Sequence, residues 1–135
     1  KSRVDEVLQM VGLTEKANEK AKKYSNGMKQ RLLIARALLP SPEVIFLDEP
    51  TKGLDPGVAR AIRNIVADLA KEGVTIFLTT HYMEEADRLC RRVAILEKGK
   101  IVALDTPARL KAQHGGPDTS LEDVFIALTG KDLYR

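Results

Sequence analysis

Two adjacent carboxylates, Asp48 and Glu49, follow the apolar run 44–47. Such a run is typical of a strand covered on both faces, and open α/β sheets bind ligands at the carboxyl ends of their strands. Because strand side chains alternate, we expect the two carboxylates to face opposite directions. One can then hold Mg²⁺ through water, and the other can orient or deprotonate an attacking water molecule. Taken alone, the pair is equally typical of a strand that merely ends in acidic surface residues.

A second candidate site is the turn Ser25-Asn26-Gly27, which precedes a helical pattern. Ser25 is suited to cap the helix, and Asn26 and Gly27 can adopt backbone conformations that bring amide groups toward an anion. A helix N-terminus adds free N–H donors and the positive end of the helix dipole. Most isolated turns of this kind bind nothing, so only the surrounding motifs can indicate whether this turn binds an anion.

His81 follows a second apolar run, directly after Thr79 and Thr80. An imidazole at that strand end could contact a terminal phosphate and report its presence. A single histidine is more often structural, and His114, in a polar glycine-rich loop, keeps that interpretation.

Composition limits the other functions. The 135 residues, 44% of them apolar, suffice for one modest core. The 22 basic residues are scattered except for two short runs without interleaved aromatics, so nucleic-acid binding is not expected. The single cysteine, Cys90, excludes an intrachain disulfide and is interpreted as a small buried helix residue. Since no apolar run is long enough to span a bilayer, a membrane role would come through a partner.

Helical and strand patterns alternate along the chain, which predicts an α/β fold with a parallel sheet and right-handed crossovers. Helices are expected over 3–11, from 28 to before Pro40, over 57–71, 83–90, from 107, and over 121–128; strands are expected over 44–47, 74–80, 93–97 and 101–104. Residues 98–100 are expected to turn the last two strands into a hairpin. Residues 1–112 are expected to form the main part, and 113–135 a C-terminal loop and helix whose start, Ser120 to Asp123, resembles a capping box.

Four segments resemble, in order and spacing, the signature, Walker B, D-loop and switch motifs of ABC transporter ATP-binding subunits. They are Tyr24-Ser25-Asn26-Gly27-Met28, Leu47-Asp48-Glu49-Pro50-Thr51, Gly53-Leu54-Asp55-Pro56 and Thr79-Thr80-His81-Tyr82-Met83-Glu84-Glu85-Ala86. The resemblance covers nearly the whole chain and looks closest to the multidrug and ABC-2 export branch. It implies a partial P-loop NTPase core: a parallel sheet with flanking helices, followed by a β-hairpin and helices.

The resemblance also implies residue roles. Glu49 would be the general base, His81 the switch residue and Asp48 the residue that serves Mg²⁺.

Further roles concern a second nucleotide-binding domain in a head-to-tail dimer. Ser25 and Gly27 would contact the γ-phosphate of ATP bound to that domain, with Asn26 between them in the same nucleotide-binding loop. Asp55 would communicate across the interface. The signature departs from its commonest form at Tyr24, Asn26 and Met28; Asn tolerates the left-handed region better than most residues.

No Gly-x-x-x-x-Gly-Lys-Ser/Thr phosphate loop occurs in the 135 residues. The family carries that loop in the first half of its domain, so the chain resembles the second half, with the phosphate-loop strand absent. Unpaired strand edges would then favour self-association. The resemblance further implies a membrane-spanning permease partner and a cytoplasmic location, peripheral to the inner face of the cell membrane.

Two other interpretations stay open at this level. One is a fragment of a soluble ABC ATPase outside transport, which would usually carry a second cassette or a long coiled-coil insertion. The other is a noncatalytic interaction module that keeps the fold, although the retained Asp48, Glu49, Asp55 and His81 argue against it. An adjacent permease gene with six apolar spans would favour transport.

The missing phosphate loop generates the first prediction. The 135-residue chain by itself should show no Mg²⁺-dependent ATPase activity above background, because the Lys and N–H cradle that supply most ground-state binding are not in it. ATP should also leave its melting temperature unchanged, since only a ligand that binds the native state raises it. Turnover that persists through purification and disappears in Glu49→Gln would overturn this expectation.

Overall fold

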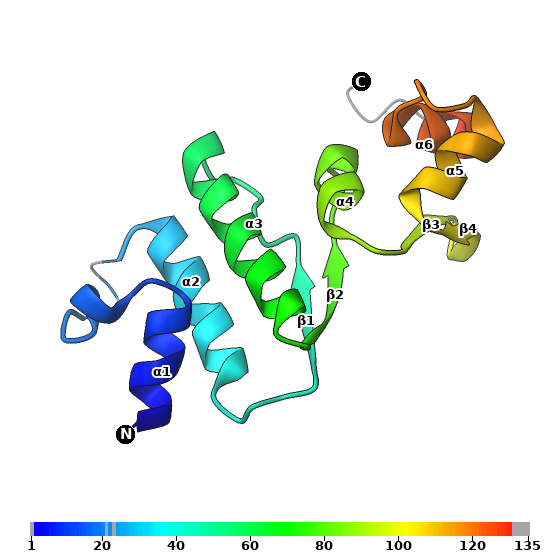
Figure 1. Ribbon diagram of the computed structural model, residues 1–135. Coiled ribbons are helices and arrows are strands. Elements are labelled where there is room, and N and C mark those ends of the chain that lie inside the picture. Colours follow the sequence, from blue (N-terminus) through cyan, green and yellow to red (C-terminus); the bar gives the residue numbers. More distant parts are fainter. Residues whose placement is uncertain (1, 21, 23, 131–135) are drawn as a thin grey trace. The chain divides into compact units, whose positions relative to one another are not determined.

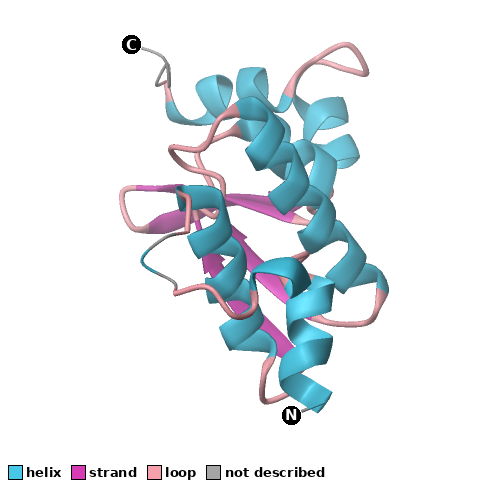
Figure 2. Ribbon diagram, turned by 90° about the vertical axis from the view of Figure 1, so that its left-hand side faces the viewer, coloured by secondary structure: helices cyan, strands magenta, loops and turns pink. Residues whose placement is uncertain are grey.

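The structure is a computed structural model that describes residues 2–20, 22 and 24–130. The chain divides into two compact units, Lys1–Thr79 and Thr80–Arg135, and both combine helices with strands (Figures 1 and 2). The predicted boundary near residue 113 is not tested by this division and stays a prediction. Among the described residues, no helix is long and apolar enough to cross a membrane.

The first unit alternates helices and strands as predicted. Its elements are α1 (Ser2–Met10), the short 3₁₀ helix η1 (Thr14–Lys16), α2 (Asn26–Leu38), β1 (Val44–Asp48), α3 (Pro56–Lys71) and β2 (Thr75–Thr79). α1 packs on α2, α2 packs on α3, and α3 packs on β2. The buried stripe of α3 recurs at helical spacing and comprises Ala59, Ile62, Val66 and Leu69. This stripe anchors the helix whose first turn contributes to the candidate site.

β1 and β2 form a parallel pair, as the α/β pattern predicted. One face of β1 is buried through Ile45 and Leu47. On the other face, Phe46 and Phe77 are 77% and 60% exposed, and their rings stack with centroids 5.2 Å apart. The expectation of a strand covered on both faces is therefore wrong for the described structure. A continuous apolar run satisfies the pattern of a fully buried strand, but in β1 only the side of Ile45 and Leu47 is buried.

The second unit contains α4 (Met83–Leu89), β3 (Val93–Glu97), β4 (Lys100–Asp105), α5 (Pro107–His114) and α6 (Leu121–Thr129). β3 and β4 form the predicted antiparallel hairpin, with an irregularity in register between Ile95 and Leu96. Lys98 and Gly99 both have positive φ, 51° and 78°, which suits the tight turn.

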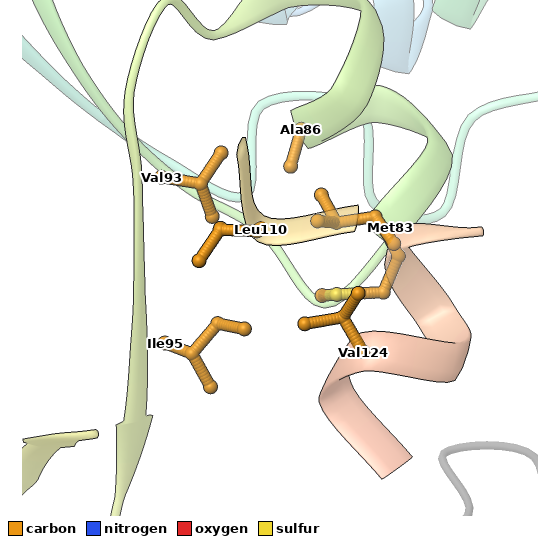
Figure 3. Close-up of a cluster of buried hydrophobic side chains, with 7 residues drawn as sticks. Met83, Ala86, Val93, Ile95, Leu110 and Val124 are labelled. Carbon is orange, nitrogen blue, oxygen red and sulfur yellow. The ribbon is translucent and has the colours of Figure 1, made fainter. Parts of the chain in front are cut away.

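A compact apolar cluster holds this second unit together (Figure 3). Its buried members come from four elements: Met83 and Ala86 of α4, Val93 and Ile95 of β3, Leu110 of α5, and Leu121 and Val124 of α6. Because each of these elements contributes at least one side chain, the hairpin and the three helices form one packed body.

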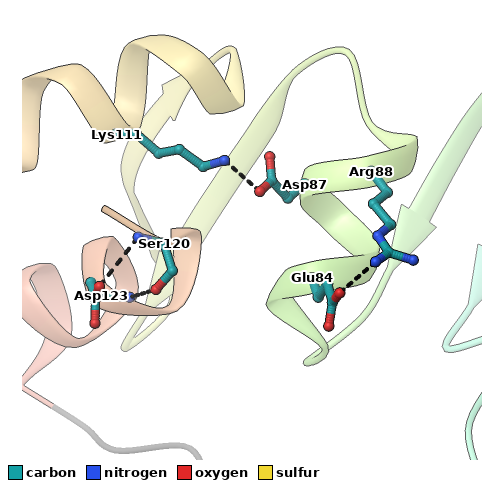
Figure 4. Close-up of polar contacts among 6 residues, drawn as sticks. All are labelled: Glu84, Asp87, Arg88, Lys111, Ser120 and Asp123. Atoms are coloured by element: carbon teal, nitrogen blue, oxygen red, sulfur yellow. Dashed lines mark hydrogen bonds and ion pairs between the residues drawn. The ribbon is translucent and has the colours of Figure 1, made fainter. Parts of the chain in front are cut away.

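Polar contacts fix the same helices at the surface (Figure 4). Lys111 Nζ lies 2.5 Å from Asp87 Oδ2, which ties α5 to α4. Ser120 and Asp123 form the predicted capping box: Ser120 Oγ accepts from Asp123 N at 3.0 Å, and Asp123 Oδ2 accepts from Ser120 N at 3.2 Å. The sequence signal for the start of α6 is therefore confirmed.

Cys90 follows α4 and is partly buried. Burial, and secondly the neighbouring Glu85 carboxylate, raise the pKa of the Cys90 thiol. A raised pKa keeps the sulfur protonated at neutral pH, where it is a poor nucleophile. This environment agrees with a packed rather than a catalytic residue. The expectation of a buried helix residue is wrong, because Cys90 has an extended backbone after the end of α4 and is only partly buried.

The exposed aromatic pair of β1 and β2 predicts self-association of the 135-residue chain. Burying Phe46 and Phe77 against a second copy removes a large apolar surface from water. Light scattering at low micromolar concentration should then give a mass above the 14.9 kDa monomer. Phe46→Lys/Phe77→Lys should restore the monomer.

The matched control is Leu96→Lys/Ile101→Lys, which adds the same charge to an exposed apolar pair of the hairpin. It should leave the association intact. A monomeric parent chain, or association abolished by the hairpin variant alone, would contradict the prediction.

Candidate functional site

The parallel register places Asp48, the last residue of β1, directly opposite Thr79, the last residue of β2. The Thr79 hydroxyl donates a hydrogen bond to Asp48 Oδ1. The Thr79 hydroxyl oxygen also accepts from the backbone N–H of Glu49 at 3.1 Å, and the Thr79 carbonyl accepts from that N–H at 2.9 Å. One threonine thus orients both consecutive carboxylate residues at the carboxyl edge of the sheet.

Glu49 lies outside the strand and has φ 46°, in the left-handed region that residues other than glycine rarely occupy. A conformation of this kind costs about 1–3 kcal/mol and is found where the surrounding structure holds it, often at functional sites. The two acceptors of Thr79 provide that restraint. We expected strand alternation to turn the two carboxylates in opposite directions. Because Glu49 lies outside the strand, alternation does not set the direction of its side chain, and that reasoning is corrected here.

Lys52 forms an ion pair with the Glu49 side chain, with Nζ 3.4 Å from Oε2. The Lys52 side chain is 64% exposed, and exposed ion pairs contribute little to stability. A turn also connects the two residues, because Lys52 N donates to Glu49 O at 3.1 Å. Backbone bonds, more than this ion pair, hold the loop after β1.

Ser25 caps α2 as predicted. Its backbone is extended, with φ −63° and ψ 167°, and its Oγ accepts from Met28 N at 3.2 Å. A serine hydroxyl that accepts one hydrogen bond still has its own proton to donate. Ser25 is exposed, so its O–H is accessible to an anion, and the first residue of α2, Asn26, is exposed as well.

Asn26 and Gly27 begin the helix itself, and neither has positive φ. The tolerance of Asn for the left-handed region, noted from the sequence, is therefore not used here. Gly27 is required by packing: it is buried, and a Cβ built on it would lie only 2.4 Å from Cγ1 of Val58. The glycine allows α2 to approach α3 closely, which a sequence motif cannot reveal.

Asp55 caps α3, a role that the sequence analysis did not predict. Its Oδ1 accepts from Val58 N at 2.9 Å, and Pro56 occupies the first helical turn. Aspartate before Pro is a common start of a helix, so the signal was present in the sequence. Since Asp55 is exposed, its second carboxylate oxygen lies at the surface of the unit.

His81 belongs to the second unit and is exposed. Its ring lies 4.4 Å from the ring of Tyr82, with 34° between the planes. Tyr82 N donates to Thr80 Oγ1 at 3.0 Å, which shapes the turn before α4. The ring contact and this turn hold His81 next to the start of α4.

The structure thus groups Ser25, Asn26, Gly27, Asp48, Glu49 and Asp55 in the first unit, and places His81 in the second. Within the first unit, contacts link Asp48 to Glu49 through Thr79, and Gly27 to Asp55 through Val58. Sequence reasoning missed both connecting residues. Thr79 had a weak signal, as the residue that ends the neighbouring parallel strand.

Comparison with known proteins defines the class. Residues 6–87, more than half of the chain, match the family model described as "AAA domain, putative AbiEii toxin, Type IV TA system". The chain is 55% identical over 106 residues to a fluoroquinolones export ATP-binding protein of Mycobacterium tuberculosis, covering 78% of this chain and 35% of the relative. It is 43% identical over 129 residues to the linearmycin resistance ATP-binding protein LnrL of Bacillus subtilis, covering 96% and 40%.

Among solved structures, the chain is similar to cbiO1 from Clostridium perfringens, described as part of the ABC transporter complex cbiONQ. The TM-score is 0.77 and the identity 32%, over 83% of this chain and 45% of that one. The chain thus belongs to the AAA domain family whose model matches residues 6–87. More narrowly, it is homologous to ATP-binding subunits of ABC transporters, and it spans about a third to two fifths of the length of the curated relatives above.

Thr79→Val tests whether the Thr79 hydroxyl positions the two carboxylate residues without being needed for the fold. The change is nearly isosteric but removes the hydroxyl that bonds Asp48 and Glu49, at a cost of about 1 kcal/mol of unfolding free energy. For the ATPase activity proposed below, we expect a lower kcat in the full-length protein, with ATP binding retained.

The matched control is Thr75→Val on the same strand, where the register partner is Val44 instead of a carboxylate. It should leave both the rate and the stability near their original values. Equal rates for the two variants would show that Thr79 does not position the site.

Proposed function

We propose that the full-length protein binds and hydrolyses ATP as a subunit of an ABC transporter. The observation that carries the proposal is the pair Asp48 and Glu49, which Thr79 holds at the carboxyl edge of a parallel sheet. Ligands bind at that edge in open α/β sheets. The relatives in drug export and drug resistance support the transport branch.

Glu49 is proposed as the general base. Hydrolysis needs a basic oxygen within reach of the attacking water, and the loop holds Glu49 in one backbone conformation before substrate arrives. Preorganisation of this kind avoids the cost of ordering the loop during the reaction. The strain at φ 46° is consistent with a conformation kept for function.

Asp48 fits the requirements of Mg²⁺, which binds through one or two carboxylates together with water and substrate phosphates. Among the described residues, no group of three or more His, Cys, Asp or Glu side chains is placed to hold a metal ion by itself. A single oriented carboxylate with a neighbouring hydroxyl suits an ion whose other ligands are phosphate and water. When bound, the ion would neutralise phosphate charge.

Ser25, Asn26 and Gly27 are proposed to contact the γ-phosphate of ATP held by a second nucleotide-binding domain in a head-to-tail dimer. The exposed hydroxyl of Ser25 and the first turn of α2 supply donors without a basic side chain. Asp55 is proposed to face the same partner, and His81 to sense the terminal phosphate.

We further propose that a membrane-spanning permease is the other partner. The protein would then act in the cytoplasm, at the inner face of the cell membrane. The solved relative cbiO1 is part of a transporter complex, which supports this assembly for the family.

Glu49→Gln and Ser25→Asp in the full-length protein test the proposal separately. Glu49→Gln removes the base but keeps the shape, so hydrolysis should fall by about a hundredfold or more while ATP binding persists and a nucleotide-bound dimer accumulates. Ser25→Asp still caps α2, because aspartate caps as well as serine, but it replaces a donor with a negative charge beside the phosphate.

Ser25→Asp should therefore keep its helix content by circular dichroism and lose ATP-dependent dimerisation by light scattering. The control is Asp118→Asn, which changes one charge on an exposed loop of the second unit. Asn26→Asp would not serve as a control, because it alters the same loop as Ser25→Asp. Hydrolysis at the parent rate in both Glu49→Gln and Ser25→Asp would refute the site assignment.

A further inference from the structure

Val58 connects the two loops that face the proposed dimer partner. Its backbone N–H donates to Asp55 Oδ1 at 2.9 Å, so Val58 closes the cap of α3. Its side chain meets Gly27, where a Cβ would lie 2.4 Å from Cγ1. One residue in the first turn of α3 thus contacts the Asp55 cap through its backbone and the first turn of α2 through its side chain.

From this arrangement we infer that Val58 is a positioning residue for the proposed ATP site. It fixes the distance between the signature turn at Gly27 and the Asp55 loop, so that both reach the partner's nucleotide as one unit. The inference rests on the proposed function and adds to it a residue outside the family-like motifs described above.

The chemistry of the contact is purely steric. Gly27 is buried, and its φ does not require glycine. Alanine is therefore compatible with the helical backbone of residue 27 and is excluded only by the Val58 side chain. Truncating Val58 to alanine removes both Cγ atoms and leaves Cβ at 3.7 Å, an ordinary van der Waals distance. A size exchange between the two positions should consequently restore the packing.

The test is a double-mutant cycle in the full-length protein. Gly27→Ala should lower ATPase kcat by about tenfold or more, since displacing reacting groups by even ~1 Å is costly. Val58→Ala should lower kcat less, and Gly27→Ala/Val58→Ala should return to at least the Val58→Ala rate. Such non-additivity is the signature of a direct contact.

A second readout separates positioning from simple packing. Val66→Ala is the matched control: it makes the same truncation at a buried position further along α3, away from both loops. We expect Val66→Ala to lower the melting temperature while leaving kcat and ATP-dependent dimerisation unchanged. Val58→Ala, measured in a Glu49→Gln background, should weaken dimerisation with little change in ATP affinity.

The outcomes are distinct. The role of Val58 is refuted if the double variant is as inactive as Gly27→Ala, or if Val58→Ala and Val66→Ala lose dimerisation equally. The proposed function still stands in that case, provided that Glu49→Gln stops hydrolysis. Hydrolysis at the parent rate in Glu49→Gln overturns the proposed function instead. Should Gly27→Ala fail to fold, Val58→Ala and the isosteric Val58→Thr keep the inference testable, with Val58→Thr expected to preserve dimerisation.

Discussion

The parallel register of β1 and β2 is the constraint on which the candidate site depends. It sets Thr79 opposite Asp48, and only then can one hydroxyl bond both Asp48 and the N–H of Glu49. A slip of one residue would turn every side chain of the strand to the other face. Ile45 and Leu47 oppose such a slip, because their burial fixes which face of β1 points inward.

Residues proposed for function also maintain the local fold. Ser25 and Asp55 each cap a helix, and Gly27 permits the two capped helices to approach through Val58. A cap is worth about 1 kcal/mol, so a truncation to alanine at either position changes stability and chemistry together. Substitutions that keep the cap, such as aspartate for serine, are therefore more informative than alanine at this site.

Much of the fold followed from local patterns. Apolar periodicity identified the helices and strands, and the caps at Ser25 and Ser120 were readable because their hydrogen bonds are local. Contacts between distant segments were not: Thr79 acts on Asp48 across 31 positions, and the size of Gly27 is set by Val58 on another helix. The apolar run of β1 also gave a wrong prediction of burial on both faces. Alternation divides such a run between two faces, but the run does not show what covers each face.

The two faces of β1 have different consequences for the site. Phe46 and Asp48 lie two residues apart and hence on the same face, with Phe77 and Thr79 in register beside them. The exposed aromatic pair and the Asp48–Thr79 pair are therefore neighbours on one face of the sheet. Strand geometry thus links that face to the position of Asp48, whereas Ile45 and Leu47 line the opposite, buried face.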